Sequence, residues 1–316
     1  MADRDSTMAG KMCLVTGATA GIGFVTAREL ARRGATVVLV SRSPERCQRA
    51  VATIREATNN PAVEFIAADL SAQAEVRRLA REYQQHHERL HVLVNNAGAL
   101  FASREESVEG IEKTLALNHL AYFLLTNLLL ATLQASAPAR VVNVSSRGHT
   151  IVRGFDFDNP QARPRGRWGY GRSGLVSVLY TLVAPIIHPA FRQYARTKLA
   201  NLLFTYELAR RLKGTGVTVN ALHPGFVASS FMAGNGFLGW MMRRWAGLFG
   251  ISAEQGAQTS IYLATAPELE GVTGKYFVKC HEAPSSAASL DETAAQRLWV
   301  LSEQLTNGHG VSGSAL

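Results

Sequence analysis

The chain has 316 residues, of which 47% are hydrophobic and 18% are charged, so it can form a globular protein with a large core. The formal net charge is +9, but the basic residues are scattered over helical patterns without an aromatic–basic motif, which argues against nucleic-acid binding. The three cysteines, Cys13, Cys47 and Cys280, include no C-x-x-C pair, so we expect neither a disulfide framework nor a metal site.

Residues 1–10 are polar and contain no apolar run of the kind that marks a secretory signal. We therefore expect a flexible N-terminus and a cytoplasmic protein. The excess of positive charge also suits an anionic ligand or an anionic membrane surface, so membrane association stays open.

Short apolar stretches alternate with helical patterns between residues 11 and 280. We expect strands at 12–15, 37–40, 63–67, 92–94, 140–144, 217–222 and 275–278. Helices are expected from 43 onward and at 22–33, 75–87, 110–133 and 191–213. Strands that are apolar throughout are typical of parallel sheets covered on both faces, so the pattern predicts a single α/β domain with a doubly wound parallel sheet, the Rossmann fold.

The first strand leads into a glycine-rich turn, Gly17-x-x-x-Gly21-x-Gly23, which opens a helix. The first N–H groups of a helix have no intrahelical partner, and glycine lets a diphosphate approach the backbone closely. Alone, this turn is either a dinucleotide site or a plain helix entry.

The second strand ends at Ser41-Arg42, without the acidic residue that binds the ribose 2′-hydroxyl of NAD. Arg42 can bind a 2′-phosphate instead, with Ser41 and Arg46 assisting, which favours NADP(H). The alternative is a surface arginine without a ligand, and NAD(H) stays open as the cofactor.

Tyr194 and Lys198 lie four residues apart on the predicted helix 191–213, so their side chains share one face. An ammonium group beside a phenol lowers the pKa of the phenol and makes it a useful acid or base near neutral pH, whereas the alternative is an exposed pair. Ser146 ends the fifth strand, where its hydroxyl either polarises a carbonyl or caps a turn. Asn118 interrupts an apolar helix, and its amide holds either a backbone group or a water.

Several motifs follow in order along the chain: the glycine-rich turn, Asp69, Asn95-Asn96-Ala97-Gly98, Asn118, Ser146, Tyr194-x-x-x-Lys198 and Pro224-Gly225. In this order they resemble the short-chain dehydrogenase/reductase family, and more narrowly its retinol dehydrogenase-like branch, from about residue 11 to residue 278.

The resemblance implies that Tyr194 exchanges the proton and that Lys198 lowers its pKa and binds the nicotinamide ribose. It implies further that Ser146 orients the substrate carbonyl and that Asn118 holds a relay water. The implied cofactor site comprises Gly17, Thr19, Gly21, Ile22, Gly23, Ser41, Arg42, Arg46, Asp69, Leu70, Asn95, Ala97, Gly98, Tyr194, Lys198, Pro224, Gly225, Val227 and Ser229.

These features predict an NADP(H)-dependent oxidoreductase that interconverts an alcohol and a carbonyl on a small lipophilic substrate. The alternative is a nucleotide-binding regulatory protein of the same fold with little turnover. A third reading is a scaffold at a membrane surface.

An insertion at 147–190 separates Ser146 from Tyr194 by more residues than the resembled family usually places there. Residues 175–191 carry no charge and 163–172 are rich in arginine, so the insertion is either a lid over the substrate or a peripheral membrane contact. Residues 231–249 are expected to form the opposite wall. Two prolines within the uncharged stretch argue against a membrane span.

The apolar helix 110–133 faces either a partner, as the homodimers of the resembled family imply, or only the sheet. His119 and His223 are expected to be structural, because no carboxylate–histidine cluster accompanies them. Residues 281–316 are expected to hold a helix with a capping box, Ser289-x-x-Glu292, and a disordered end.

Overall fold

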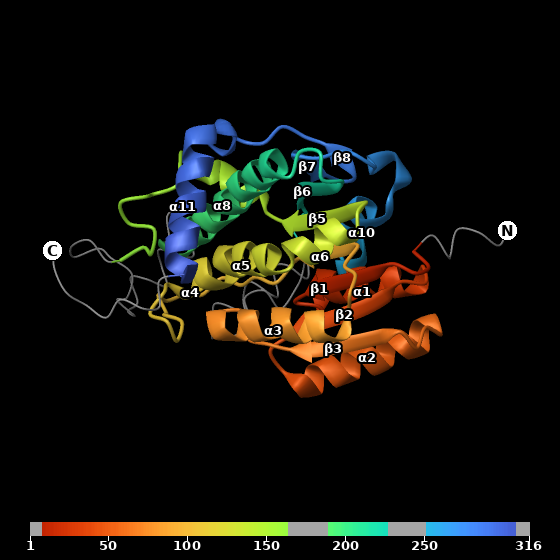
Figure 1. Ribbon diagram of the computed structural model, residues 1–316. Coiled ribbons are helices and arrows are strands. Elements are labelled where there is room, and N and C mark those ends of the chain that lie inside the picture. Colours follow the sequence, from red (N-terminus) through yellow and green to blue (C-terminus); the bar gives the residue numbers. More distant parts are fainter. Residues whose placement is uncertain (1–7, 164–188, 227–250, 308–316) are drawn as a thin grey trace.

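The computed structural model describes residues 8–163, 189–226 and 251–307. At its centre is a sheet with the strand order β3-β2-β1-β4-β5-β6-β7-β8 (Figure 1). The strands are β1 (Met12–Thr16), β2 (Thr36–Ser41), β3 (Val63–Ala67), β4 (Val92–Asn95), β5 (Ala139–Val144), β6 (Val217–His223), β7 (Lys275–Val278) and β8 (His281–Glu282). All neighbours pair in parallel except β7 and β8, so the predicted doubly wound parallel sheet is confirmed.

The helices cover both faces of this sheet (Figure 1). They are α1 (Gly21–Arg32), α2 (Pro44–Thr58), α3 (Gln73–His86), α4 (Lys113–Leu115), α5 (Ala121–Leu128), α6 (Leu130–Ala135), α8 (Pro189–Arg211), α10 (Ala253–Thr265) and α11 (Glu292–Asn307). Short helical turns are η1 (Ala116–Leu120), η2 (Arg147–Ile151), η6 (Pro267–Leu269) and η7 (Ala287–Leu290).

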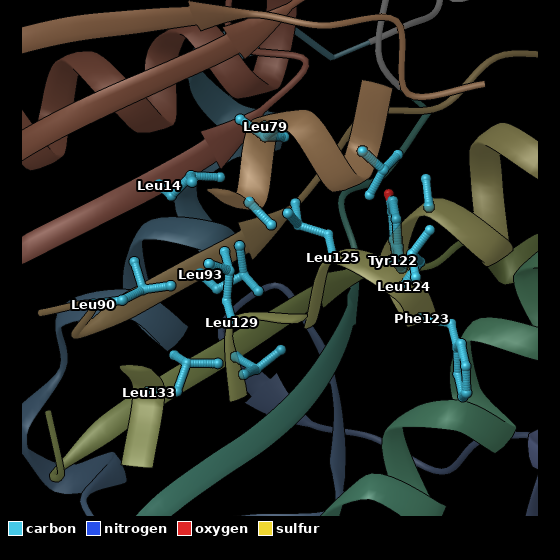
Figure 2. Packing of buried hydrophobic residues seen from close by; sticks show 14 of the residues in the cluster. Leu14, Leu79, Leu90, Leu93, Tyr122, Phe123, Leu124, Leu125, Leu129 and Leu133 are labelled. Carbon is cyan, nitrogen blue, oxygen red and sulfur yellow. The ribbon is translucent and has the colours of Figure 1, made fainter. Parts of the chain in front are cut away.

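Two hydrophobic cores lie on opposite faces of the sheet, because successive side chains of a strand point to opposite faces. In β1, Leu14 enters the core beneath α3, α5 and α8, whereas Cys13 and Val15 enter the core beneath α1, α2 and α10. Figure 2 shows the first of these cores, in which Leu14 lies near Leu79 of α3. The continuous apolar character of the predicted strands therefore follows from burial on both faces.

The helix starts follow the capping residues that the sequence carries. The Ser43 hydroxyl accepts a hydrogen bond from the backbone N–H of Arg46, and Pro44 occupies the first turn of α2, as predicted. Helix α10 was not predicted, although Ser252 and Gln255 form a complete capping box at its start. This capping signal is visible in the sequence and could have located α10.

The predicted helix 110–133 is divided into α4, a π-helical turn, α5 and α6. Most of α5 is buried beneath the sheet and α3, which accounts for its apolar sequence. The π-helical turn η1 contains Asn118, and such turns inside α-helices frequently occur at functional sites.

The C-terminal helix α11 packs against α8 (Figure 1). Its expected capping box is wrong, because Ser289 belongs to the preceding turn η7 and its hydroxyl donates to the carbonyl of Ser286. Instead, the Asp291 carboxylate accepts a hydrogen bond from the backbone N–H of Ala294. Asp291 lies nearer the helix than Ser289 does, so the cap is displaced by two residues along the sequence.

Helix α11 also reaches across to α3. The Gln73 amide donates to the carbonyl of Leu305 at 2.8 Å, and the Arg77 guanidinium donates to the carbonyl of Thr306 at 2.7 Å. These side chains satisfy carbonyls in the last turn of α11, which have no partner within the helix. The last turn of α11 is therefore capped by a helix from the first half of the chain.

Some predictions fall on residues outside the described ranges. These residues are 1–7, 164–188, 227–250 and 308–316, so they include most of the insertion, the expected opposite wall and the end of the chain. Within the ranges that are described, no helix has the length and apolar character needed to cross a membrane.

Trp299 should be the main anchor of α11. Its ring lies 4.9 Å from that of Phe123 and 4.0 Å from the Arg211 guanidinium, measured to the ring centroid. We expect Trp299→Ala to lower the free energy of unfolding by about 3–5 kcal/mol, because it leaves a cavity at this contact. Val300→Ala is the control, since Val300 is 50% exposed and should change stability by less than about 0.5 kcal/mol in the same urea titration. Equal losses of unfolding free energy in both variants would show that Trp299 is not the main anchor of α11.

Candidate active site

The candidate site lies beyond the carboxyl ends of the central strands. Ser146 follows β5 directly, and Tyr194 and Lys198 lie one turn apart on α8. The Ser146 hydroxyl and the Tyr194 ring are neighbours, because both lie close to Gly148, although 48 residues separate them in sequence. The fold therefore brings Ser146, Tyr194 and Lys198 together, as predicted from the spacing and the motifs.

The electrostatics differ from the expectation for an ammonium beside a phenol. Burial raises the pKa of Tyr194 to about 12, and the hydrogen bond from Ser146 opposes this rise. Burial also lowers the pKa of Lys198 to about 7. The Lys198 Nζ donates to the carbonyl of Val144 at 2.9 Å and lies 5.6 Å from the centroid of the Tyr194 ring. Desolvation therefore shifts the pKa of the phenol upward, opposite to the lowering expected from a neighbouring ammonium.

Asn118 is fully buried and holds the loop after β4. Its Oδ1 accepts from the N–H of Ala99, and its Nδ2 donates to the carbonyl of the same residue, each at 2.9 Å. Its Nδ2 also lies 3.3 Å from the Thr197 hydroxyl on α8. A Cβ at Gly98 would lie 3.2 Å from Asn118 Oδ1 and 3.6 Å from Lys198 Nζ, so the loop, Asn118 and Lys198 are close neighbours.

The glycine-rich turn is wound tightly against the end of β4. A Cβ on Gly17, whose φ is +67°, would lie 2.9 Å from the Cα of Ala97, and one on Gly23 would lie 2.4 Å from the carbonyl oxygen of Gly17. Helix α1 begins at Gly21 with Ala20 as its N-cap, without a capping side chain and without an acidic residue in its first turn. An uncapped helix N-terminus beside a glycine turn fits the diphosphate of a dinucleotide.

Asn96 also shapes this turn and was missed as a site residue. Its Nδ2 donates to the carbonyl of Thr16 at 2.8 Å, and its backbone N–H donates to the Thr16 hydroxyl at 2.9 Å. The N–H of Ala97 donates to the same hydroxyl at 3.0 Å. The sequence shows two adjacent asparagines here, and of these Asn96 is the one that faces the turn.

Asn95 is the other member of that pair, and its side chain points into the fold. Its Nδ2 donates to the hydroxyl of Thr126 at 3.0 Å and to Oδ1 of Asn143 at 2.9 Å. Asn143 in turn donates to the Thr205 hydroxyl of α8 at 3.0 Å. The Asn95 amide nitrogen thus ties β4 to β5 and α5, and the buried side chain points away from the predicted contact with a cofactor.

The remaining residues of the predicted cofactor site lie along the same edge. The Thr19 and Ser41 hydroxyls are 3.1 Å apart, which joins the glycine-rich turn to the end of β2. Arg42 and Arg46 are exposed, and neither forms an ion pair with another described residue.

Other predicted cofactor residues have mainly structural contacts. The Asp69 carboxylate accepts hydrogen bonds from the N–H and the hydroxyl of Ser71, and Leu70 is buried. The Ile22 side chain packs in the cluster between α1 and α10, which leaves its backbone N–H at the helix start.

The segment after β6 closes this edge of the sheet. Pro224 is partly buried, and Gly225 has a φ of +97°. A Cβ on Gly225 would lie 2.4 Å from Cδ1 of Ile251, so a side chain there would be both strained and crowded. The predicted contacts of Val227 and Ser229 lie outside the described residues.

Two further residues support the site and were not predicted. The Ser145 hydroxyl donates to the carbonyl of Lys198 at 2.8 Å, which fixes α8 on the end of β5. Gly148 lies against the reactive groups, because a Cβ there would be 3.4 Å from Ser146 Oγ and 3.6 Å from Cε1 of Tyr194. No group of three His, Cys, Asp or Glu side chains within the described part of the chain is placed to hold a metal ion.

Comparisons with known proteins match this chain to a family of enzymes. The short chain dehydrogenase family model matches residues 11–153. Human retinol dehydrogenase 11 is 41% identical over 294 residues, which cover 93% of this chain and 85% of that protein.

Solved structures also match the fold of this chain. An uncharacterised protein from Mycobacterium paratuberculosis has 31% identity and a TM-score of 0.72, over 95% of this chain and 94% of that chain. The RhlG/NADP active-site complex from Pseudomonas aeruginosa has 28% identity and a TM-score of 0.62, over 87% of this chain and 96% of that chain.

The fold and the site define an oxidoreductase that acts on CH–OH donors with a dinucleotide cofactor. A doubly wound sheet of this kind binds its ligands beyond the carboxyl ends of the strands, and the serine, tyrosine and lysine lie at that edge. The chain belongs to the short-chain dehydrogenase/reductase family, and its relatives place it with the retinol dehydrogenase-like members.

Lys198→Met should make the protein more stable while it removes the cation from the site. The pKa of Lys198 falls from its ordinary 10.5 to about 7, so folding disfavours the charged form. The cost of burying the ammonium therefore grows as pH falls from 10.5 to 7 and is constant below that. We expect a gain of about 0.5–2 kcal/mol at pH 7, and a smaller one at pH 10, in urea titrations of the protein without cofactor. A gain that is independent of pH would show that desolvation of the ammonium is not its cause.

Proposed function

We propose that this protein interconverts a lipophilic alcohol and its aldehyde or ketone, with NADP(H) as the preferred cofactor. The observation that carries the proposal is that Ser146 lies beside Tyr194, with Lys198 one turn further along the same helix. A nucleotide-binding protein that only regulates does not require a serine, a tyrosine and a lysine together beside the cofactor edge.

The proton chemistry follows from the pKa values of the site. Tyr194 is protonated at neutral pH because burial raises its pKa to about 12, so it is ready to donate a proton to the oxygen of a carbonyl substrate. The Ser146 hydroxyl holds the same oxygen in place, and Lys198 and Asn118 lie behind the tyrosine. In the reverse direction the phenol takes the proton from the alcohol. The dinucleotide, when bound, supplies or accepts the hydride.

The preference for NADP(H) rests on the end of β2. Arg42 and Arg46 present exposed guanidinium groups there, and Ser41 is joined to the glycine-rich turn through Thr19. A guanidinium group can make two parallel hydrogen bonds to a phosphate, whereas NAD has only a hydroxyl at this position. The relative solved with NADP, at 28% identity, is consistent with this choice.

The substrate class rests on the relatives and on two phenylalanines that follow or adjoin the site residues. The relatives at about 40% identity are named retinol dehydrogenases, which points to a long apolar alcohol or aldehyde. Phe191 lies 6.0 Å from Tyr194 between ring centroids, and Phe226, after β6, is 57% exposed. An exposed phenylalanine at this position also suits a peripheral contact with a membrane, from which such substrates would be taken.

Tyr194→Phe should remove most turnover and leave NADPH binding nearly intact. The substitution deletes the proton donor, and general acid–base catalysis contributes about a hundredfold to ten-thousandfold. The measurement is kcat for NADPH oxidation with retinal, a long-chain aldehyde and a short-chain aldehyde, with fluorescence titration of NADPH as the binding control. If wild-type protein binds NADPH but turns over none of these carbonyls, the regulatory reading replaces the enzymatic one. If the variant turns over within a few-fold of wild type, Tyr194 is not the proton donor.

Arg42→Ala should weaken the preference for NADPH over NADH. Hydrogen bonds to charged groups contribute about 1.5–3 kcal/mol, so we expect the ratio of kcat/KM values to fall by about 10- to 100-fold. Arg49→Ala is the matched control, because it removes an exposed arginine of the same helix region further from the strand end. A wild-type preference for NADH, or equal effects of the two substitutions, would refute the role of Arg42.

A further inference from the structure

We infer that His149 is a positioning residue that sets the place of Ser146 and ties it to the loop before α11. The inference rests on the proposed role of Ser146 in the reaction. His149 lies three residues after Ser146 in the turn η2 and is 1% exposed. Nothing in the chemistry of the reaction itself requires a histidine at this point.

Both ring nitrogens of His149 have backbone partners. Nδ1 is 2.7 Å from the carbonyl oxygen of Ser146, and Nε2 is 3.2 Å from the backbone nitrogen of Ser286. A carbonyl only accepts and an N–H only donates, so the ring is neutral with its proton on Nδ1. Burial lowers the pKa of His149, which keeps it in this form. The Tyr276 ring packs edge-on against it, with the centroids 5.3 Å apart.

The loop that receives His149 is itself fixed to α8. Next to Ser286, the Ser285 hydroxyl accepts a hydrogen bond from the Tyr206 phenol at 2.8 Å. Tyr206 lies on the same helix as Tyr194. A closed path of contacts therefore runs from Ser146 through His149 and the loop to α8, and it fixes the serine relative to the tyrosine.

The same turn is held from the other side by β6. The backbone N–H of Arg147 donates to Nδ1 of His223 at 3.2 Å. Burial, together with the nearby Arg147 and His149, lowers the pKa of His223 to about 4, so it accepts this bond at neutral pH. The turn that follows Ser146 is thus held by one neutral imidazole at Ser146 and by another at Arg147. Gly148 of the same turn lies beside both Ser146 and Tyr194, so this turn also joins the serine to the tyrosine.

Two substitutions at His149 separate positioning from packing. The amide of asparagine lies as many bonds from Cα as Nδ1 does, so His149→Asn keeps the donor to Ser146. The amide of glutamine lies as far as Nε2, so His149→Gln keeps only the contact to Ser286. We expect similar losses of Tm in both variants. However, kcat should stay within a few-fold of wild type in His149→Asn and fall about tenfold to a hundredfold in His149→Gln, with the Kd for NADPH unchanged in both.

A second pair changes the loop and leaves His149 intact. Ser286 has a φ of −69°, which proline adopts, so Ser286→Pro deletes the N–H donor without forcing this angle. Ser286→Ala keeps the N–H and removes only the hydroxyl. We expect kcat in Ser286→Pro to fall by the same few-fold as in His149→Asn, because both lose only the contact between residues 149 and 286, and to stay at the wild-type level in Ser286→Ala. This pair decides the question if His149→Gln does not fold.

Ser146→Ala, measured alongside, distinguishes a failure of the proposed function from a failure of the positioning role of His149. Wild-type turnover in Ser146→Ala would overturn the proposed function itself. Loss of turnover in Ser146→Ala, with equal kcat in the two His149 variants or in the two Ser286 variants, would overturn only the positioning role of His149.

Discussion

The candidate site depends on the junction between the end of β5 and α8. The Ser145 hydroxyl holds the backbone of Lys198, and the Lys198 ammonium holds the carbonyl of Val144. Two turns further along the helix, Asn143 of β5 donates to Thr205. Buried polar groups cost free energy when they lose their partners, so this network allows α8 only one position along the strand. That position brings Tyr194 to Ser146.

Burial of the groups at this junction also determines their pKa values. Desolvation favours the neutral forms, so the phenol of Tyr194 keeps its proton and the pKa of Lys198 lies near physiological pH. The lysine is therefore able to change its charge in response to what binds beside it. A more open site would have left both groups near their ordinary pKa values and made the lysine a permanent cation.

The sequence predicted the sheet, because strands buried on both faces and glycine at a tight turn leave strong patterns. It also predicted which residues meet at the end of β5, because the tyrosine–lysine spacing and the strand-end serine are local signals.

The orientation of side chains could not be predicted from the sequence in this way. Asn95 and Asn96 are adjacent and chemically identical, but one points into the core and the other holds Thr16. The sign of the Tyr194 pKa shift also depends on burial, which residue spacing does not report. His149 was missed because its partners are backbone groups, one of them 137 residues away.

The contacts between α3 and the last turn of α11 join parts of the chain that are far apart in sequence. Helix α3 belongs to the half of the sheet that begins the chain, whereas α11 packs on α8 in the other half. A doubly wound sheet consists of two βαβ halves that could open separately. Because the chain's final helix is anchored to both, neither half can unfold without releasing it. The two halves are thereby made one cooperative unit, which completes its hydrogen bonds only after the last residues of α11 have been synthesised.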